Sequence, residues 1–234
     1  MRQIVLDTET TGLSWEKGNR IVEVGCIELV ERRPTGRQFQ RYFNPGREME
    51  PGAQEVTGLS LDFLLDKPRF ETVLDELLDF IRGAELIIHN ASFDVGFLNN
   101  ELSLAGAHYG RLEHHASVLD TLAMARERFP GQRNSLDALC KRLGVDNGHR
   151  KLHGALLDAE LLAEVYLGLT AGQGDLGLAP VGEPGQVRRL DVPVSLDGAR
   201  RVLRASEAET AAHEARIAKM AAKSGKRLWP DATP

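Results

Sequence analysis

Three β-rich segments separated by short turns open the chain and limit the folds that it can adopt. Residues 3–8, 20–31 and 37–43 are rich in Ile, Val, Leu or Phe, and glycine, asparagine or proline lies in the intervening turns. Connections this short favour antiparallel pairing of neighbouring strands. The sequence therefore predicts an antiparallel meander at the start of the fold.

Helical periodicity follows this meander. Apolar residues recur at helical intervals over residues 70–81, the pattern stops at Gly83, and residues 85–89 read as a short buried strand. The remaining predicted elements are a helix over 92–105 capped by Ser92, a short strand at 118–119, and helices over 121–130, 135–143 and 155–169. Together they predict an α/β domain with a mixed sheet of about five strands flanked by helices.

The composition changes after Thr170. Residues 171–186 are rich in glycine and proline and contain few residues that could form a core, which is typical of a flexible linker. The predicted organisation is therefore a domain over residues 1–170, a linker over 171–186 and a tail over 187–234.

The tail contains one predicted helix. Ser206 and Glu209 form a capping box at the start of an alanine-rich segment that stops at Gly225. Trp229 follows, either as the anchor of a partner-binding segment or as part of a frayed tail. The sequence leaves both alternatives open.

Charge is distributed unevenly within a net charge of −5. Residues 1–170 contain 19 Lys and Arg against 26 Asp and Glu, and residues 171–234 contain 10 against 8. Proteins that hold duplex DNA along its phosphates are usually basic. The acidic first part therefore fits metal binding and argues against broad nonspecific DNA binding.

Cysteine content and the N-terminus indicate an intracellular setting. Cys26 and Cys140 each lie among apolar neighbours, which is typical of reduced core thiols. The first residues reach Asp7 after three apolar positions, so they predict neither a signal peptide nor a membrane span. We expect a soluble, cytoplasmic protein that does not contact a membrane.

Two carboxylates stand at the end of the first predicted strand. Asp7 and Glu9 are two residues apart, so they point to the same face and can reach one metal ion. Two carboxylates beside an apolar strand repel each other, and a positive group is expected between them. Oxygen ligands of this kind favour Mg²⁺ or Mn²⁺.

Asp94, His153 and Asp158 extend this acidic pattern. Asp94 follows another short apolar strand, in the first turn of the next helix, where α/β folds gather functional groups. On one continuous helix, His153 and Asp158 would be rotated by about 140° from each other. They can share a site if the helix begins after Gly154, which leaves His153 on the preceding loop.

These motifs resemble those of a known family. Asp7-Thr-Glu9-Thr-Thr-Gly, His89-Asn-Ala-Ser-Phe-Asp94 and His153-Gly-Ala-Leu-Leu-Asp158, in this order, are similar to the three motifs of the DEDD exonucleases in their histidine-bearing branch. Within that branch, residues 2–173 and Ala212-His-Glu-Ala-Arg resemble the proofreading subunits of bacterial replicative DNA polymerases. The resemblance implies a ribonuclease H-like fold and 3′-to-5′ hydrolysis of DNA.

The resemblance also implies a role for each motif residue. Two divalent cations, Mg²⁺ or Mn²⁺, would be held with Asp7 bridging them, Glu9 and Asp158 completing the site of the attacking water, and Asp94 serving the second ion, directly or through a water. His153 would be the general base, because an imidazole can accept a proton near neutral pH. The product would be a nucleoside 5′-monophosphate.

Further residues match the family's pocket for the terminal nucleotide. The expected substrate-binding residues are Thr8, Thr10, Leu13, Thr57, Asn90 and Phe93. Phe93 could stack on the terminal base or be an ordinary core residue. Asp120 resembles an additional ligand, but it is equally explained as the N-cap of the following helix.

The expected partners also come from the resemblance. The substrate would be a single-stranded or frayed DNA 3′ end, and the tail would bind the catalytic (alpha) subunit of the polymerase. Gln173, Leu176 and Leu178 resemble a short motif that binds the sliding clamp (beta), and the resemblance favours this over the alternative of plain linker. A related 3′-to-5′ exoribonuclease and a binding subunit with a vestigial site are the alternative functions.

Overall fold

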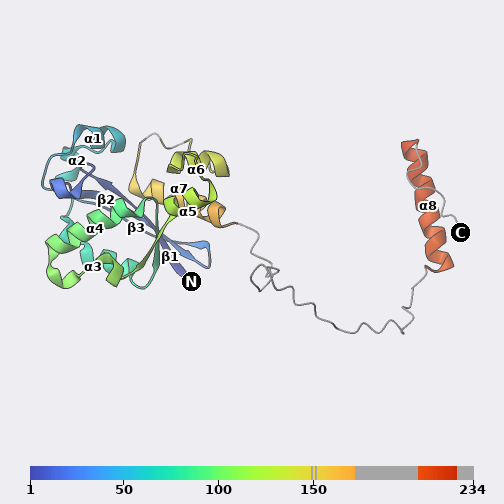
Figure 1. Cartoon of the computed structure of the whole chain (residues 1–234), viewed down its shortest axis with the longest axis horizontal. Helices are drawn as coiled ribbons and strands as arrows, with labels where there is room; N and C mark the ends of the chain where they lie inside the picture. Colours follow the sequence, from blue (N-terminus) through green and yellow to red (C-terminus); the bar gives the residue numbers. More distant parts are fainter. Residues whose placement is uncertain (149, 151, 172–204, 226–234) are drawn as a thin grey trace, which may run out of the picture. The chain divides into compact units, whose positions relative to one another are not determined.

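The computed structural model describes residues 1–148, 150, 152–171 and 205–225 (Figure 1). Contacts divide the chain into two compact units, Met1–Leu178 and Ala179–Pro234. The strands are β1 (Arg2–Thr10), β2 (Ile21–Val30), β3 (Arg33–Tyr42), β4 (Glu85–Ile88) and β5 (Ser117–Asp120). The α-helices are α1 (Pro51–Thr57), α2 (Leu61–Leu64), α3 (Leu74–Ile81), α4 (Ala91–Ala105), α5 (Thr121–Arg128), α6 (Leu136–Leu143), α7 (Ala155–Thr170) and α8 (Glu207–Ser224).

The five strands form one mixed sheet in the order β3-β2-β1-β4-β5. β1, β2 and β3 pair antiparallel, whereas β4 runs parallel to both β1 and β5. The predicted meander and the predicted five-stranded mixed sheet are therefore confirmed. The carboxyl ends of β1, β4 and β5 meet at one edge of the sheet, which is where parallel strands gather functional groups.

Helices cover both faces of the sheet (Figure 1). On one face, Ile4 and Leu6 of β1 pack in a core cluster with residues of α3 and α4. On the other face, Val5 packs with Leu162 and other residues of α7. Alternate residues of β1 thus serve opposite layers, as the two-residue period of a strand requires.

The hairpin between β2 and β3 corrects one predicted boundary. β3 begins at Arg33, four residues earlier than predicted, because Glu31 and Arg32 alone form the turn, both with positive φ. Two consecutive residues with positive φ are typical of a tight two-residue hairpin turn. Pro34 is tolerated inside β3 because β3 is an edge strand.

Three further predicted boundaries also differ from the structure. The helix predicted over residues 70–81 is a 3₁₀ turn, Phe70–Thr72, followed by α3. α4 is preceded by Asn90, not capped by Ser92, and Asn90 adopts a left-handed conformation that asparagine tolerates. α5 ends at Arg128, two residues before Pro130. α1 and α2 were not predicted, because their short segments show no clear helical period.

Several local predictions are confirmed. α6 begins after its N-cap Ser135, and α7 begins at Ala155, directly after Gly154. Cys26 and Cys140 are buried free thiols. Among the described residues, no helix is long and apolar enough to cross a membrane.

In the second unit, α8 is the described element. The side chain of Ser206 accepts a hydrogen bond from Glu209 N, and the Glu209 side chain accepts one from Ser206 N, so the predicted capping box is confirmed. The helix ends at Gly225 in a left-handed conformation, as predicted. Residues 172–204 of the predicted linker and tail, which include Gln173, Leu176 and Leu178, lie outside the described residues, as does Trp229.

Candidate active site

The end of β1 directs two carboxylates toward α7. Asp7 and Glu9 continue the face of Val5, which packs on α7, because alternate residues of a strand share a face. Asp158 is buried in the first turn of α7. The sheet and one helix therefore bring together three acidic residues from opposite ends of the domain.

A fourth carboxylate reaches the same edge from the other face of the sheet. Asp94 is 3% exposed in the first turn of α4, and the hydroxyl of Thr8 donates a hydrogen bond to its Oδ1 at 2.7 Å. Thr8 points to the face opposite Asp7 and Glu9. Asp94 is thus held through Thr8 and belongs to a different layer from Asp158.

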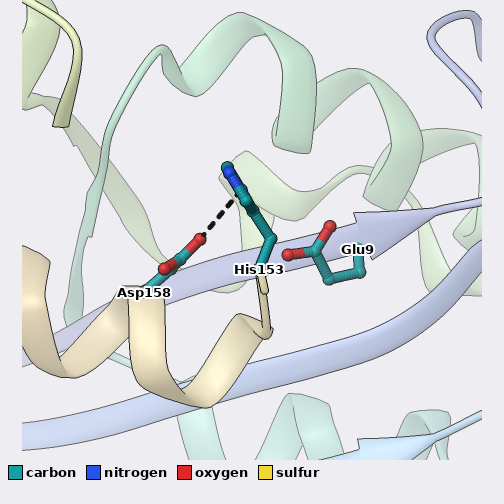
Figure 2. A group of neighbouring side chains, drawn as sticks. All are labelled: Glu9, His153 and Asp158. Carbon is teal, nitrogen blue, oxygen red and sulfur yellow. Dashed lines mark ion pairs between the residues drawn. The ribbon is translucent and has the colours of Figure 1, made fainter. Parts of the chain in front are cut away.

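Three potential ligands converge most closely. One ligand atom each of Glu9, His153 and Asp158 lies within 4.8 Å of the others. Figure 2 shows Glu9 extending from β1, Asp158 from α7 and His153 from the loop before α7. His153 Nδ1 lies 3.4 Å from Asp158 Oδ2. The two residues share a site because α7 begins after Gly154, as their spacing requires.

A guanidinium, that of Arg150, lies beside the carboxylates, and the sequence motifs did not identify it. Its guanidinium donates to Asp158 Oδ1 from Nε at 2.5 Å and to Oδ2 from Nη2 at 2.6 Å. It also bonds His153 Nδ1 at 2.9 Å and Asp137 Oδ1 at 2.7 Å. Two features of the sequence could have identified Arg150. It lies three residues before His153, and a positive group was expected near the carboxylates.

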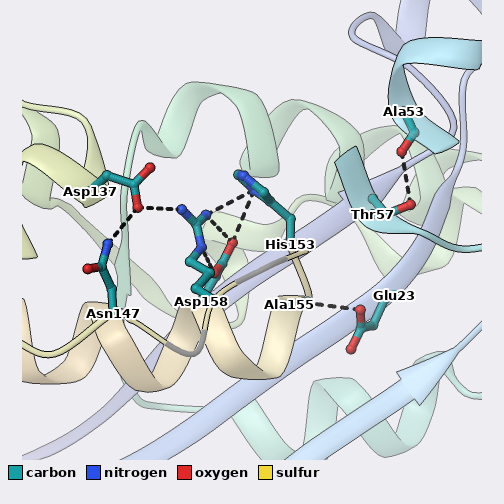
Figure 3. Close-up of polar contacts among 9 residues, drawn as sticks. Glu23, Ala53, Thr57, Asp137, Asn147, His153, Ala155 and Asp158 are labelled. Carbon is teal, nitrogen blue, oxygen red and sulfur yellow. Dashed lines mark hydrogen bonds and ion pairs between the residues drawn. The ribbon is translucent and has the colours of Figure 1, made fainter. Parts of the chain in front are cut away.

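Asp137 extends the hydrogen-bond network of Arg150 from the site to α6. Asn147 donates to Asp137 Oδ1 at 3.0 Å, beside the His153 and Asp158 pair (Figure 3). Asp137 lies in the first turn of α6. The loop between α6 and α7 is therefore tied to both helices through charged and amide groups.

Burial and mutual repulsion raise the pKa values of the acidic side chains. Burial first, and then Asp158 and Glu23, raise the pKa of Glu9 to about 8. Burial and the charges of Asp94, Glu9 and Asp158 raise the pKa of Asp7 well above its usual value. One guanidinium does not offset this much negative charge.

Asp94 shows the same effect with a counteracting contact. Burial raises its pKa to about 7, although the hydrogen bond from Thr8 acts in the opposite direction. Carboxyl groups with raised pKa values that cluster in a hollow are typical of a functional site. The hard oxygen donors of Asp7, Glu9, Asp94 and Asp158 fit a divalent cation such as Mg²⁺ or Mn²⁺.

Two residues of β2, Glu23 and Gly25, position the start of α7, and the sequence did not predict either contact. Gly154 has no side chain that could cap the helix, and the buried carboxylate of Glu23 instead accepts a hydrogen bond from Ala155 N at 3.1 Å (Figure 3). A Cβ on Gly25 would lie 2.2 Å from the backbone nitrogen of Leu156. Gly25 therefore allows α7 to approach β2 closely enough for its first turn to face the site.

Two adjoining hollows open beside these residues. One, of about 190 Å³, is lined by the acidic residues, His153 and Arg150; the other, of about 330 Å³, has mainly apolar walls. Thr8, Glu9 and Phe93 line both. The other expected substrate residues are divided between them: Thr10, Leu13 and Thr57 line the larger hollow, and Asn90 lines the smaller one.

Phe93 and Asp120 were the ambiguous residues of the motifs. Phe93 lines the hollows and also packs on Phe97 with ring centroids 4.9 Å apart, so it has both a core contact and an open face. Asp120 caps α5 by accepting from Leu122 N at 2.8 Å, and it also accepts from Asn90 N at 3.2 Å. The capping explanation of Asp120 is thus confirmed.

Sequence comparison relates the chain to known exonucleases. A family model described as Exonuclease matches residues 4–166. The DNA polymerase III subunit epsilon of Escherichia coli strain K12 is 48% identical over 238 residues, which is 97% of this chain and 97% of that protein. The DNA polymerase III subunit epsilon of Rickettsia felis is 54% identical over 173 residues, 74% of this chain and 76% of that protein.

Solved structures share the fold at lower identity. Exonuclease X in complex with 5′ overhanging duplex DNA is similar with a TM-score of 0.57 and 23% identity, over 71% of this chain and 90% of that one. Exonuclease I without ligand is similar with a TM-score of 0.60 and 17% identity, over 74% of this chain and 42% of that one. The expected ribonuclease H-like fold is thereby confirmed.

Proposed function

The chain belongs to the exonuclease family and, within it, to the DNA polymerase III epsilon subunits, and we propose that it removes mismatched nucleotides from DNA 3′ ends as a proofreading subunit. One observation carries this proposal. Four carboxylates and His153 meet at the edge of the sheet, directly beside a hollow with mainly apolar walls. The reaction is hydrolysis of the terminal phosphodiester, which releases a nucleoside 5′-monophosphate.

Asp7, Glu9, Asp94 and Asp158 are the residues that would hold two divalent cations, Mg²⁺ or Mn²⁺. The raised pKa values of Asp7, Glu9 and Asp94 mean that these carboxyl groups are hard to ionise in the protein alone. A bound cation favours the ionised form of each group, so the raised pKa values support this assignment. Such cations would polarise the phosphate and stabilise the negative charge that develops during hydrolysis. Thr8 contributes by orienting Asp94 through its hydroxyl.

His153 is the general base, and Arg150 controls which nitrogen is available. A guanidinium only donates, so Nδ1 accepts from Arg150 and a neutral ring carries its proton on Nε2. If Arg150 is displaced from His153, Nδ1 can hold the ring proton and donate to Asp158 Oδ2, 3.4 Å away. Nε2 is then free to take a proton from the attacking water.

The larger hollow holds the terminal nucleoside. Leu13 and Val56 offer apolar surface and Phe93 offers an aromatic ring, none of which reads the identity of a base. A mismatched end unpairs at a lower free-energy cost than a matched end, so it enters a pocket for a single strand more often. Selectivity for errors then comes from fraying of the DNA.

Nucleotide release from DNA tests this function. A 3′-mismatched primer with Mg²⁺ or Mn²⁺ is expected to yield nucleoside 5′-monophosphates, faster than the matched primer does. Asp7→Ala should abolish release and His153→Ala should reduce it about 100-fold or more. Asp79→Ala, a matched change on the exposed side of α3, should leave the rate unchanged. An inactive wild-type protein with both cations would overturn the proposal.

A comparison of substrates distinguishes the proposed function from the related activity on RNA. Single-stranded DNA and RNA of the same sequence are compared under the same Mg²⁺ concentration. The DNA substrate is expected to be degraded faster. A clear preference for RNA would reassign the protein to the exoribonucleases of the same family.

The partners follow from the similarity to epsilon subunits. The tail over residues 187–234 binds the catalytic (alpha) subunit of the polymerase, and Gln173, Leu176 and Leu178 bind the sliding clamp (beta). A linker between nuclease and tail raises the local concentration of the nuclease at the primer end. Co-purification of the full chain and of residues 1–180 with each partner tests these contacts, since only the full chain should retain the polymerase.

A further inference from the structure

The loop that carries His153 is fastened to the end of α1. His153 N donates a hydrogen bond to the carbonyl oxygen of Val56 at 3.0 Å. The side chain of Leu152 lies over Gly58, since a Cβ on Gly58 would meet Leu152 Cδ1 at 2.5 Å. Two consecutive residues of the loop, Leu152 and His153, therefore contact the segment from Val56 to Gly58.

Gly58 suits this contact for two reasons. It ends α1 in a left-handed conformation, with φ of 69°, and its N–H donates to the carbonyl of Gln54 at 2.8 Å. Glycine adopts this conformation without strain, and its missing side chain leaves room for Leu152. Any larger residue would push against Leu152, which is adjacent to His153.

The same helix forms a wall of the larger hollow. Gly52, Ala53, Val56 and Thr57 of α1 all line it. Thr57 is the buried residue of α1, and its hydroxyl donates to the carbonyl of Ala53 within the helix (Figure 3). Because little of α1 is buried, displacement of this helix has a low free-energy cost.

We propose that residues Val56 to Gly58 are the seat that positions His153, and that a nucleoside in the hollow fixes α1 and with it the general base. This inference rests on the proposed function, because it assigns the hollow to the terminal nucleoside. The base is therefore positioned best when the pocket is full. Val56 and Gly58 are positioning residues that act through His153.

Steady-state kinetics test whether the segment Val56 to Gly58 positions His153. One variant adds a side chain that collides with Leu152, and a matched variant adds the same side chain where nothing is in contact. Gly58→Ala should lower kcat about 10- to 100-fold, since small misplacements of a catalytic group are costly, with a smaller change in KM. Gly83→Ala has the same φ of 69° but no neighbour within 4 Å, so it reproduces the backbone strain without the collision. The kcat of Gly83→Ala should stay within about twofold of wild type. An equal loss in both variants would overturn the inference.

Leu152→Ala tests the contact from the other side. Leu152 is 51% exposed, so its truncation leaves the core intact. In the double variant Gly58→Ala with Leu152→Ala, removal of the collision should restore kcat to the level of Leu152→Ala alone. A double variant as slow as Gly58→Ala would show that contact with Leu152 is not the cause.

A spectroscopic measurement separates this inference from the proposed function. Thymidine has no phosphate that could form a charged contact with the imidazole, so the part of its effect on His153 that depends on Gly58 reaches the ring through the protein. The ring resonances of His153, assigned with His153→Gln, should shift when thymidine binds to wild type and to Gly83→Ala, and much less in Gly58→Ala. Unmoved ring resonances, or no shift of the Thr57 and Leu13 amides, would overturn the inference even if nucleotide release from DNA is observed. If release fails but the ring responds, the seat stands and the proposed reaction is wrong.

Discussion

One guanidinium holds both oxygens of the Asp158 carboxylate: Arg150 Nε lies 2.5 Å from Oδ1 and Nη2 lies 2.6 Å from Oδ2. Both side chains are almost completely buried. The same guanidinium reaches His153 Nδ1. Arg150 therefore stabilises the acidic site, and it also occupies the groups that a divalent cation and the general base would use.

Arg150→Gln should destabilise the protein without metal far more than with metal. Removing one partner of a buried ion pair costs about 3 kcal/mol. In the metal-bound protein, Asp158 has the cation as its partner, so the loss should be smaller. Thermal unfolding in EDTA and in Mn²⁺ measures the difference. Arg111→Gln, which removes an exposed pair with Glu113, should change stability by about 1 kcal/mol or less in both. Equal losses of Arg150→Gln in EDTA and Mn²⁺ would show that Arg150 does not share its position with a cation.

Glu9 should make the metal-free protein less stable as pH rises. Its pKa is raised from 4.5 to about 8 by burial, Asp158 and Glu23. A raised carboxyl pKa means that the folded state favours the protonated form, so this contribution is fully present below pH 4.5 and is lost as pH rises toward 8. The loss is on the order of a few kcal/mol. Denaturant unfolding in EDTA between pH 5 and pH 8 measures it.

Glu9→Gln is the corresponding variant. An amide cannot ionise, so the variant should be more stable than wild type at pH 8 in EDTA and should lose much of the pH dependence. Glu164→Gln, a matched change at an exposed position of α7, should follow the wild-type curve. If Glu9→Gln and wild type keep parallel curves, the charge of Glu9 is not the cause.

Thr8→Val should weaken cation binding through Asp94. The hydrogen bond from Thr8 lowers the pKa of Asp94, which burial raises to about 7, so its loss leaves more Asp94 protonated. The concentration of Mn²⁺ for half-maximal nucleotide release should rise about 10-fold, more at pH 6.5 than at pH 8.5. Thr8→Ser keeps the hydroxyl and should behave as wild type. An equal effect of both substitutions would point to packing instead.

Gly25→Ala should misplace α7. The added Cβ would lie 2.2 to 2.4 Å from backbone atoms of Ala155 and Leu156, and backbone atoms cannot rotate away. We expect a loss of about 2 to 4 kcal/mol in unfolding free energy and a larger loss of nucleotide release. Gly168→Ala is a matched change in α7, where the added Cβ would lie 3.4 Å from Leu143 Cδ1 of α6, and it should be neutral or stabilising by about 0.5 kcal/mol. Normal activity of Gly25→Ala would contradict the close approach of α7 to β2.

Much of the fold was predictable from the sequence because its signals are local. The strands of the meander, the capped start of α6 and the end of α8 depend on residues within a few positions of each other. The sharing of a site by His153 and Asp158 was also predictable, because helical geometry requires α7 to begin after Gly154. The predicted starts of β3 and α4 were wrong. Pro34 is typical of a turn, but β3 already begins at Arg33. Ser92 is a typical N-cap, but Asn90 is the residue that precedes α4.

The sequence alone therefore determined which acidic residues and which histidine come together in one hollow. Only the tertiary structure decided how they are held, because their supports come from other elements of the domain. Glu23 caps α7 from β2, Arg150 neutralises Asp158, and Val56 fastens His153 from α1. Glu23 and Val56 contact residues about a hundred positions away in the chain, and no local pattern encodes a contact of that kind.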